Sequence, residues 1–217
     1  MSLVDLCKKG NLEGVKAALQ RGVGVNTKEK TGKTGLMWAV EKSHNSVVAL
    51  LLDTPNIDLN LKTSRGGNCA LLQAVRRKNN EALKLLLNVP TIDVNVVSKS
   101  GWSAVHLAVD SKNYHGLDLL LDVPGIDVNI VANGAGGSAV HRAVIHKNIE
   151  VLKQLLSHPS LTALTLNQKD KDMGVTPVML ALKRKRWEHL EVLAADPRVD
   201  LDTTDKEGRS LEEVGSR

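Results

Sequence analysis

Two short stretches of the sequence carry residue types that could do chemistry, and the first is "KTGKTG" (30–35). Its Gly-Lys-Thr resembles the end of a phosphate-binding loop, which needs a first glycine five residues before the second. Thr27 stands at that place, and the residues before it are polar rather than a buried strand. We therefore assign Gly32 to a turn that needs positive φ, and Thr34 to a helix cap.

The second stretch places a hydroxyl three residues before an imidazole, in Ser103-Ala-Val-His106 and again in Ser138-Ala-Val-His141. A nucleophile–base pair has this composition, but no orienting acid recurs with it. The two imidazoles are one repeat apart, ~10 Å, which is too far for two ligands that each lie ~2 Å from one zinc ion. The sequence therefore predicts no catalytic residue, no metal site and no cofactor, and the protein is not expected to be an enzyme.

Composition limits the core and the compartment. The chain has 217 residues, 42% of them hydrophobic and 2% aromatic, with no Phe. A core of Leu, Val, Ala and Ile suits thin, closely stacked layers. Cys7 and Cys69 are too few for a disulfide framework, and neither a membrane span nor a signal-peptide core is present. We expect a cytoplasmic protein without a membrane segment, with a nuclear location as the alternative.

Two series of marker residues recur along the chain with the same irregular spacing. The glycines recur at steps of 35, 34, 35, 38 and 34 residues: Gly32, Gly67, Gly101, Gly136, Gly174 and Gly208. The prolines recur at steps of 35, 34, 35 and 38 residues: Pro55, Pro90, Pro124, Pro159 and Pro197. Such self-similarity indicates an array of structural repeats.

Each repeat predicts two short helices and a turn, which would position the residues above. In the second repeat these helices cover 34–42 and 45–53, and Pro55 ends the second one because proline cannot continue a helix. One such unit cannot bury its own apolar faces, whereas stacked units can.

The starts of the first helices are "TGLMWA" (34–39), "SAVHLA" (103–108), "SAVHRA" (138–143) and "TPVMLA" (176–181). They resemble the T-P-L-H-x-A signature of the ankyrin repeat family, and the resemblance covers nearly the whole chain. It implies an all-α ankyrin-repeat solenoid, in which stacked helix-turn-helix units with β-hairpin-like loops form a right-handed curved array. Met37 and Met179 replace the signature His in two of these starts. Three or four extra residues after Pro159 predict a protruding hairpin around 164–173.

The repeat spacing predicts a single domain over residues 1–217, with capping repeats at both ends. The expected boundaries are 1–29 for the N-terminal capping repeat, 30–64, 65–98, 99–133, 134–171 and 172–205 for repeats 2 to 6, and 206–217 for a partial C-terminal capping repeat.

The family resemblance also implies that a partner docks on a concave surface of hairpin tips and first-helix faces. Trp102 is the leading candidate, because it follows a turn glycine and because Trp and Arg are enriched at binding hot spots. Hairpin-tip candidates are Lys30, Thr31, Lys33, Arg65 and Asn68. The predicted partner-binding residues are Trp102, Arg76, Arg77, Lys33, Lys42, Asp110, Arg142, His146, Lys183 and Arg184.

These residues and the net charge of +5 favour an acidic or amphipathic protein or peptide partner. We expect a monomeric, non-catalytic protein–protein interaction module. One alternative is an ankyrin array that recognises a nucleotide or oligonucleotide, against which the scarcity of aromatic residues argues. The other is an engineered scaffold with no natural partner, which the degenerate repeats disfavour. The basic run 183–186 fits a partner contact, a targeting signal or a solvated helix end.

Overall fold

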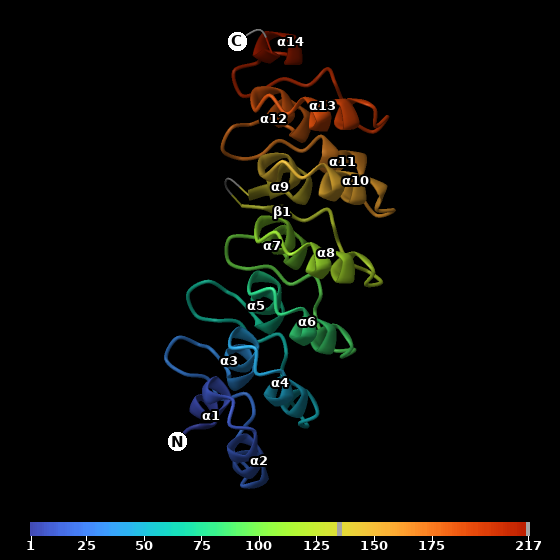
Figure 1. Ribbon diagram of the computed structural model, residues 1–217. Helices are drawn as coiled ribbons and strands as arrows, with labels where there is room; N and C mark the ends of the chain where they lie inside the picture. The colour runs from blue at the N-terminus through green and yellow to red at the C-terminus, as the bar shows by residue number, and fades with distance from the viewer. Residues whose placement is uncertain (134–135, 216–217) are drawn as a thin grey trace. The chain divides into compact units, whose positions relative to one another are not determined.

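Short helices follow one another in pairs in a computed structural model, which describes residues 1–133 and 136–215 (Figure 1). The paired helices are α1 (Leu3–Lys9) with α2 (Leu12–Gln20), α3 (Gly35–Glu41) with α4 (Asn45–Leu52), α5 (Ala70–Arg76) with α6 (Asn80–Leu87), α7 (Ala104–Asp110) with α8 (Tyr114–Leu121), α9 (Ala139–His146) with α10 (Ile149–Ser157), and α12 (Pro177–Lys183) with α13 (Trp187–Ala194). Shorter elements are α11 (Ala163–Leu166), α14 (Leu211–Gly215) and the antiparallel strands β1 (Val131–Ala132) and β2 (Gly137–Ser138). The predicted all-α class is confirmed.

The first helix of each pair begins where the sequence predicts. Thr34 accepts a hydrogen bond from the amide of Met37, and Ser103, Ser138 and Thr176 cap their helices in the same way. Each of these hydroxyls satisfies one of the amides that a helix start leaves unpaired.

The residue that follows the first helix and its cap has a left-handed backbone. Its φ lies between 54° and 59° at Ser43, Lys78, Lys112, Lys147 and Lys185. This conformation turns the chain into the second helix, and it is unfavourable for residues with a Cβ. Four of these five residues are lysines, so the left-handed turn gives this recurring lysine a structural place.

The turn glycines serve close packing as well as backbone conformation. Gly32 has a φ of 81°, as predicted, and a Cβ there would lie 2.7 Å from the amide nitrogen of Ser64. In the fifth repeat the positive φ falls on Gly137, at 56°, one residue later than the Gly136 that the spacing indicates.

The extra residues after Pro159 do not form the predicted protruding hairpin. They form α11, which Thr162 caps by accepting from the amide of Thr165. Thr165 and Leu166 are buried, while Leu164 is 77% exposed. The prediction was wrong because this segment contains both a capping hydroxyl and an apolar residue that reaches the core.

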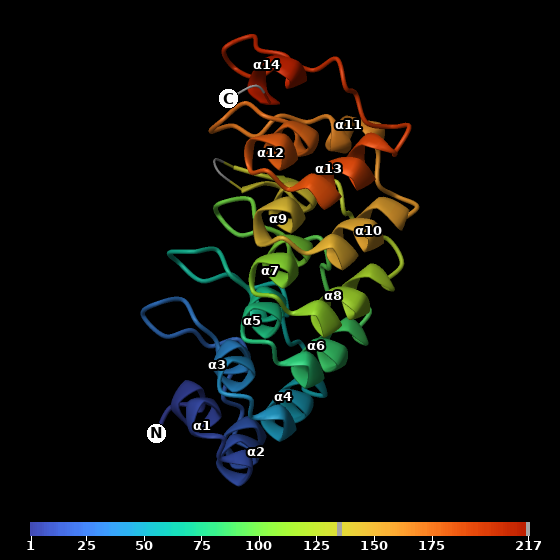
Figure 2. The ribbon, with the colours of Figure 1, turned by 45° about the horizontal axis from the view of Figure 1, so that its top comes forward.

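The chain divides into two compact units, each described by itself. Unit 1 contains Met1–Lys99 and His115–Pro124, and unit 2 contains Ser100–Tyr114 and Gly125–Arg217. In unit 1, α3 contacts α1 and α5, and α4 contacts α2 and α6 (Figure 1). In unit 2, α9 contacts α7 and α12, and α12 also contacts α14 (Figure 2). Each unit thus stacks its first helices in one row, and its apolar core is layered between successive repeats.

The core has the composition that the sequence predicts. Its largest fully buried side chains are aliphatic or Met, among them Met37, Leu71, Leu83, Leu152 and Leu155. Burying a side chain of this size stabilises the folded state by about 1.5–3 kcal/mol. No helix in the described ranges is both long and apolar enough to cross a bilayer.

Asparagine side chains join the loops of consecutive repeats. The Asn60 amide group donates to the Thr91 carbonyl (3.1 Å), and its oxygen accepts from the amide of Asp93 (3.0 Å). Asn26, Asn129 and Asn167 make the same pair of bonds to a loop 30 to 33 residues later. These bonds give the recurring Asn after the second helix a structural role.

Candidate partner-binding surface

The two Ser-x-x-His pairs are buried hydrogen-bonded cross-links in unit 2. Ser103 Oγ lies 2.8 Å from His106 Nδ1, and His106 Nε2 lies 3.1 Å from the Gly137 carbonyl oxygen. His141 bonds in the same way to Ser138 and to the Val175 carbonyl. Burial lowers the pKa of His106 to about 4 and also lowers the pKa of His141. Both rings therefore hold the hairpin of the next repeat in their neutral form.

The part of the chain that the structure describes also shows no metal site. The described residues contain no group of three or more His, Cys, Asp or Glu side chains placed to hold an ion. Instead, carboxylates near the hairpins form ion pairs with lysine and arginine side chains.

In unit 1, Glu41 at the end of α3 binds two predicted partner-binding residues. Its carboxylate lies 2.6 Å from Lys33 Nζ and 2.6 Å from Arg77 Nη2. The Lys33 ammonium also lies 3.8 Å from the centroid of the Trp38 ring. Burial raises the pKa of Glu41, but the hydrogen bonds and charges of Lys33 and Arg77 outweigh it and hold the pKa below its ordinary value. This cluster fixes Lys33 beside the hairpin.

In unit 2, the corresponding carboxylate is Asp110 at the end of α7. It pairs with the Arg142 guanidinium and lies 3.0 Å from His146 Nε2. Arg142 stacks over Trp102, with 4.8 Å between the guanidinium carbon and the ring centroid. Trp102 is therefore half-buried beneath Arg142 instead of standing free at the hairpin tip.

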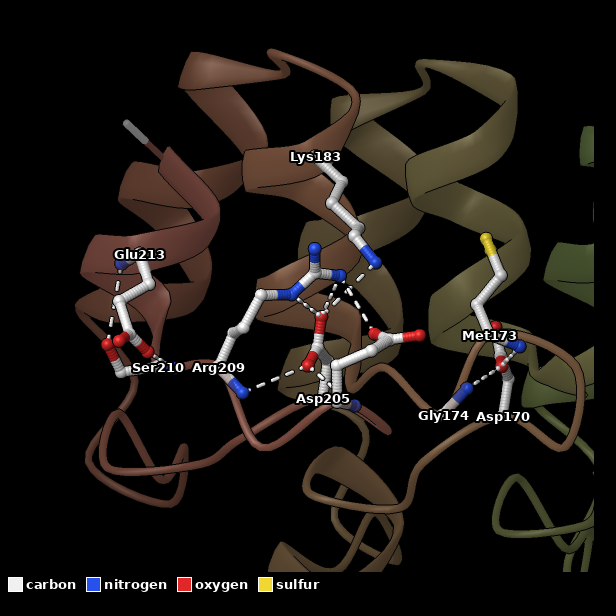
Figure 3. A network of polar contacts seen from close by, with 9 residues as sticks. Asp170, Met173, Gly174, Lys183, Asp205, Arg209, Ser210 and Glu213 are labelled. Atoms are coloured by element: carbon white, nitrogen blue, oxygen red, sulfur yellow. Dashed lines mark hydrogen bonds and ion pairs between the residues drawn. The ribbon is translucent and has the colours of Figure 1, made fainter. Parts of the chain in front are cut away.

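Lys183 also belongs to an ion-pair network (Figure 3). Its Nζ lies 3.5 Å from Asp205 Oδ2, which also binds the Arg209 guanidinium at 2.6 Å. The hydrogen bonds from Arg209 hold the pKa of Asp205 well below its usual range. Asp170 stands 35 residues earlier and accepts from the amides of Met173 (2.7 Å) and Gly174 (2.9 Å). These buried carboxylates close the hairpins, so Lys183 is held at the base of one of them.

Two adjoining hollows in unit 1 lie between the hairpin tips and the end of α5, and we call them together the cationic groove. The larger has a volume of about 510 Å³ and is lined by Lys30, Thr31, Lys33, Thr63, Ser64, Arg65, Asn68 and Gln73. The smaller has a volume of about 120 Å³ and is lined by Lys33, Glu41, Asn68, Leu72, Gln73, Arg76 and Arg77. Shared Lys33, Asn68 and Gln73 make them continuous.

The ten predicted residues thus fall into separate groups. Lys33, Arg76 and Arg77 line the cationic groove, and Lys42 is exposed at the end of α3. Trp102, Asp110, Arg142 and His146 form one cluster in unit 2, while Lys183 pairs with Asp205 and Arg184 is exposed beside it. Gln73 was missed, although a polar residue inside the apolar "ALLQAV" was a signal for it.

Stacked pairs of short helices with hairpin-like loops define a helical-repeat protein. The family model described as "Ankyrin repeats (3 copies)" matches residues 3–98 and 56–132. The chain belongs to the ankyrin repeat family, and such repeats are generally non-catalytic modules that bind protein partners.

Known proteins support this assignment at two levels. Osteoclast-stimulating factor 1 of Xenopus laevis is 43% identical over 58 residues, which are 27% of each chain, and that of Bos taurus is 41% identical over 58 residues. The match thus spans about a quarter of those relatives. The ankyrin repeat domain of Bcl-3 superposes with a TM-score of 0.84 at 23% identity, covering 99% of this chain and 93% of that one. The human ASB11 ankyrin repeat domain gives 0.73 at 18% identity, covering 99% and 91%. Both structures share the fold.

Proposed function

We propose that this protein presents a pre-formed surface of hairpins and first helices to an acidic or amphipathic protein or peptide. The observation that carries the proposal is the cationic groove, because three predicted residues, Lys33, Arg76 and Arg77, line it. A concave, polar site with several cations favours an anionic partner.

Pre-organisation supports the same role. Lys33 and Arg77 are held by Glu41, and Trp102 and Arg142 are held against each other. Side chains that are already ordered lose less conformational entropy when a partner binds. The surface therefore needs little rearrangement before association.

The proposal takes the protein to act as a monomer in the cytoplasm or nucleus. Both cysteines are buried, and burial raises the pKa of the Cys7 thiol to about 12. A buried protonated thiol is a poor nucleophile, which suits a chain that does not rely on disulfides. Sedimentation velocity with and without reductant would test this part, and a disulfide-linked dimer would contradict it.

Affinity capture tests the binding role in each unit separately. Immobilised wild type, Arg77→Ala and Trp102→Ala would be exposed to the same lysate, with Lys153→Ala on α10 as the control. Arg77 and Lys153 are exposed to similar extents, with 55% and 52% of their side chains accessible. We expect Arg77→Ala or Trp102→Ala to reduce retained partners by about tenfold, as hot-spot truncations do. Equal retention on all baits would show that the surface is placed wrongly.

A further inference from the structure

The cationic groove contains a buried hydrogen-bond acceptor that the protein itself does not use. Gln73 lies in the middle of α5 and is only 8% exposed. Its Oε1 has no hydrogen-bond partner among the residues that the structure describes. Gln73 lines both hollows, and a half-turn of its terminal amide would present this buried oxygen to a ligand that enters the groove. Buried acceptors are usually satisfied, so an unused one at a groove indicates a donor from outside.

The charges of the groove are only partly neutralised. Lys33 and Arg77 share the carboxylate of Glu41. Lys30, Arg65 and Arg76 are exposed and form no ion pair within residues 1–133 and 136–215. The five cations against one acid leave an excess of positive charge, which attracts carboxylates or phosphates.

The acceptor at Gln73 distinguishes between these two anions. A phosphate group at neutral pH offers mainly acceptors, so it would satisfy the cations but not Oε1. An acidic peptide offers carboxylates for the cations and backbone N–H donors for Oε1. The larger hollow, at about 510 Å³, falls within the range of ordinary ligand sites.

We infer that the cationic groove of unit 1 binds an extended acidic peptide segment. Side-chain carboxylates of the segment pair with Lys30, Arg65 and Arg76, and one of its backbone amides donates to Gln73 Oε1. This inference rests on the proposed function and narrows it to one groove, one peptide chemistry and one backbone contact.

The test uses fluorescence anisotropy with a labelled eight-residue peptide of alternating Glu and Ala. Matched probes are an alternating Lys and Ala peptide and a single-stranded oligothymidylate of eight nucleotides. The variants are Arg65→Gln with Arg76→Gln, and separately Gln73→Met, which keeps the size of the side chain but removes the acceptor. Lys153→Gln with Lys169→Gln, at two exposed positions of unit 2, removes the same charge outside the groove. Circular dichroism and thermal unfolding verify that each variant folds.

Of the three probes, we expect only the Glu peptide to show saturable binding to wild type. Its affinity for Arg65→Gln with Arg76→Gln should be about tenfold lower, since two charge-assisted contacts are lost. Gln73→Met should weaken it about fivefold through the lost hydrogen bond, and Lys153→Gln with Lys169→Gln should change it less than twofold.

Three results would overturn the inference: equal weakening by both double variants, full binding by folded Gln73→Met, or equally tight binding of the oligothymidylate. Absence of Glu-peptide binding would also overturn it. In that case the capture experiment decides about the proposed function separately. If wild type retains proteins that Arg77→Ala does not, the proposed function is still supported.

Discussion

The two units differ in the residues that occupy the same buried position of the first helix. At the third position of the first helix, unit 1 has Met37 and Leu72, whereas unit 2 has His106 and His141, each bonded to the next hairpin, and Met179 in α12. The apolar residues leave unit 1 with no buried imidazole at these positions. The imidazoles give unit 2 directional cross-links that exist only while the rings are neutral.

The carboxylate at the end of the first helix shows the same contrast. Glu41 in unit 1 holds two cations, yet further cations in the groove stay unpaired. Asp110 in unit 2 collects Arg142 and His146, and Trp102 covers Arg142. Unit 2 therefore uses these polar groups within its own structure, while among the described residues unit 1 leaves several cations of the groove without an acidic partner.

Acidification should produce the largest difference in stability between the two units. The pKa of His106 falls from 6.5 to about 4 on folding, so the unfolded chain binds more protons in that window and stability is lost as pH falls from 6.5. The expected loss for His106 alone is about 2 kcal/mol by pH 5. Urea unfolding at pH 7 and pH 5 measures it in two single-tryptophan variants, whose fluorescence comes only from Trp102 in unit 2 or only from Trp38 in unit 1, since the chain has three tryptophans.

The control for acidification is His106→Leu, which should flatten the pH dependence seen by Trp102. An equal loss at Trp38 and Trp102, or an unchanged slope in this variant, would show that the imidazole cross-links do not distinguish the units.

Loss of the Arg142 guanidinium should have the next largest effect. Arg142→Met leaves Asp110 without its main partner and removes the cation above Trp102, so we expect a loss of about 1–2 kcal/mol in the free energy of unfolding. Arg77→Met, on the more exposed pair of unit 1, should cost under about 1 kcal/mol. Urea denaturation of both variants provides the comparison, and equal losses would contradict it.

Glu41→Gln should sharpen the contrast in binding. Removing this carboxylate releases Lys33 and Arg77 for a ligand, so the affinity for the Glu-Ala peptide should rise about threefold, since one repulsive charge leaves the groove. Asp110→Asn makes the same change in unit 2 and should leave that affinity unaltered. Anisotropy titrations decide the matter, and a similar gain in both variants would place the peptide outside unit 1.

The smallest effect concerns a feature that the units share. Lys78 and Lys147 have φ values of 56° and 59°, where glycine is favoured. Lys78→Gly and Lys147→Gly should each stabilise the protein by about 0.5–1 kcal/mol. Thermal unfolding measures this gain, and destabilisation by either change would show that the lysine side chain outweighs the backbone strain.

The sequence predicted the repeat architecture well because that architecture depends on local signals. Thr34 and Ser103 cap helices, Gly32 turns the chain, and Pro55 follows the end of a helix. Each of these residues determines only the structure of the few residues next to it in the sequence. The α11 segment was misjudged because whether Leu166 is buried depends on a neighbouring repeat.

The candidate surface was harder to predict for the same reason. The pairing of Asp110 with Arg142 and of Lys183 with Asp205 joins residues 32 and 22 positions apart. Residue type led to the prediction that Trp102 binds a partner, whereas only the structure shows that Arg142 lies over its ring. Gln73 lines the groove together with residues of two loops, 30–33 and 63–68, which the sequence alone does not bring together.

The asparagine bonds between consecutive loops bear on how each unit would respond to mechanical tension. Asn26 and Asn60 in unit 1, and Asn129 and Asn167 in unit 2, each clasp a loop 30 to 33 residues further along. A chain pulled by its ends would load these clasps in series, so a single one can give way while the others hold. Once a clasp breaks and the repeat beside it unfolds, roughly 110 Å of extended chain would be released, at about 3.4 Å per residue, and the protein would lengthen in discrete steps under load.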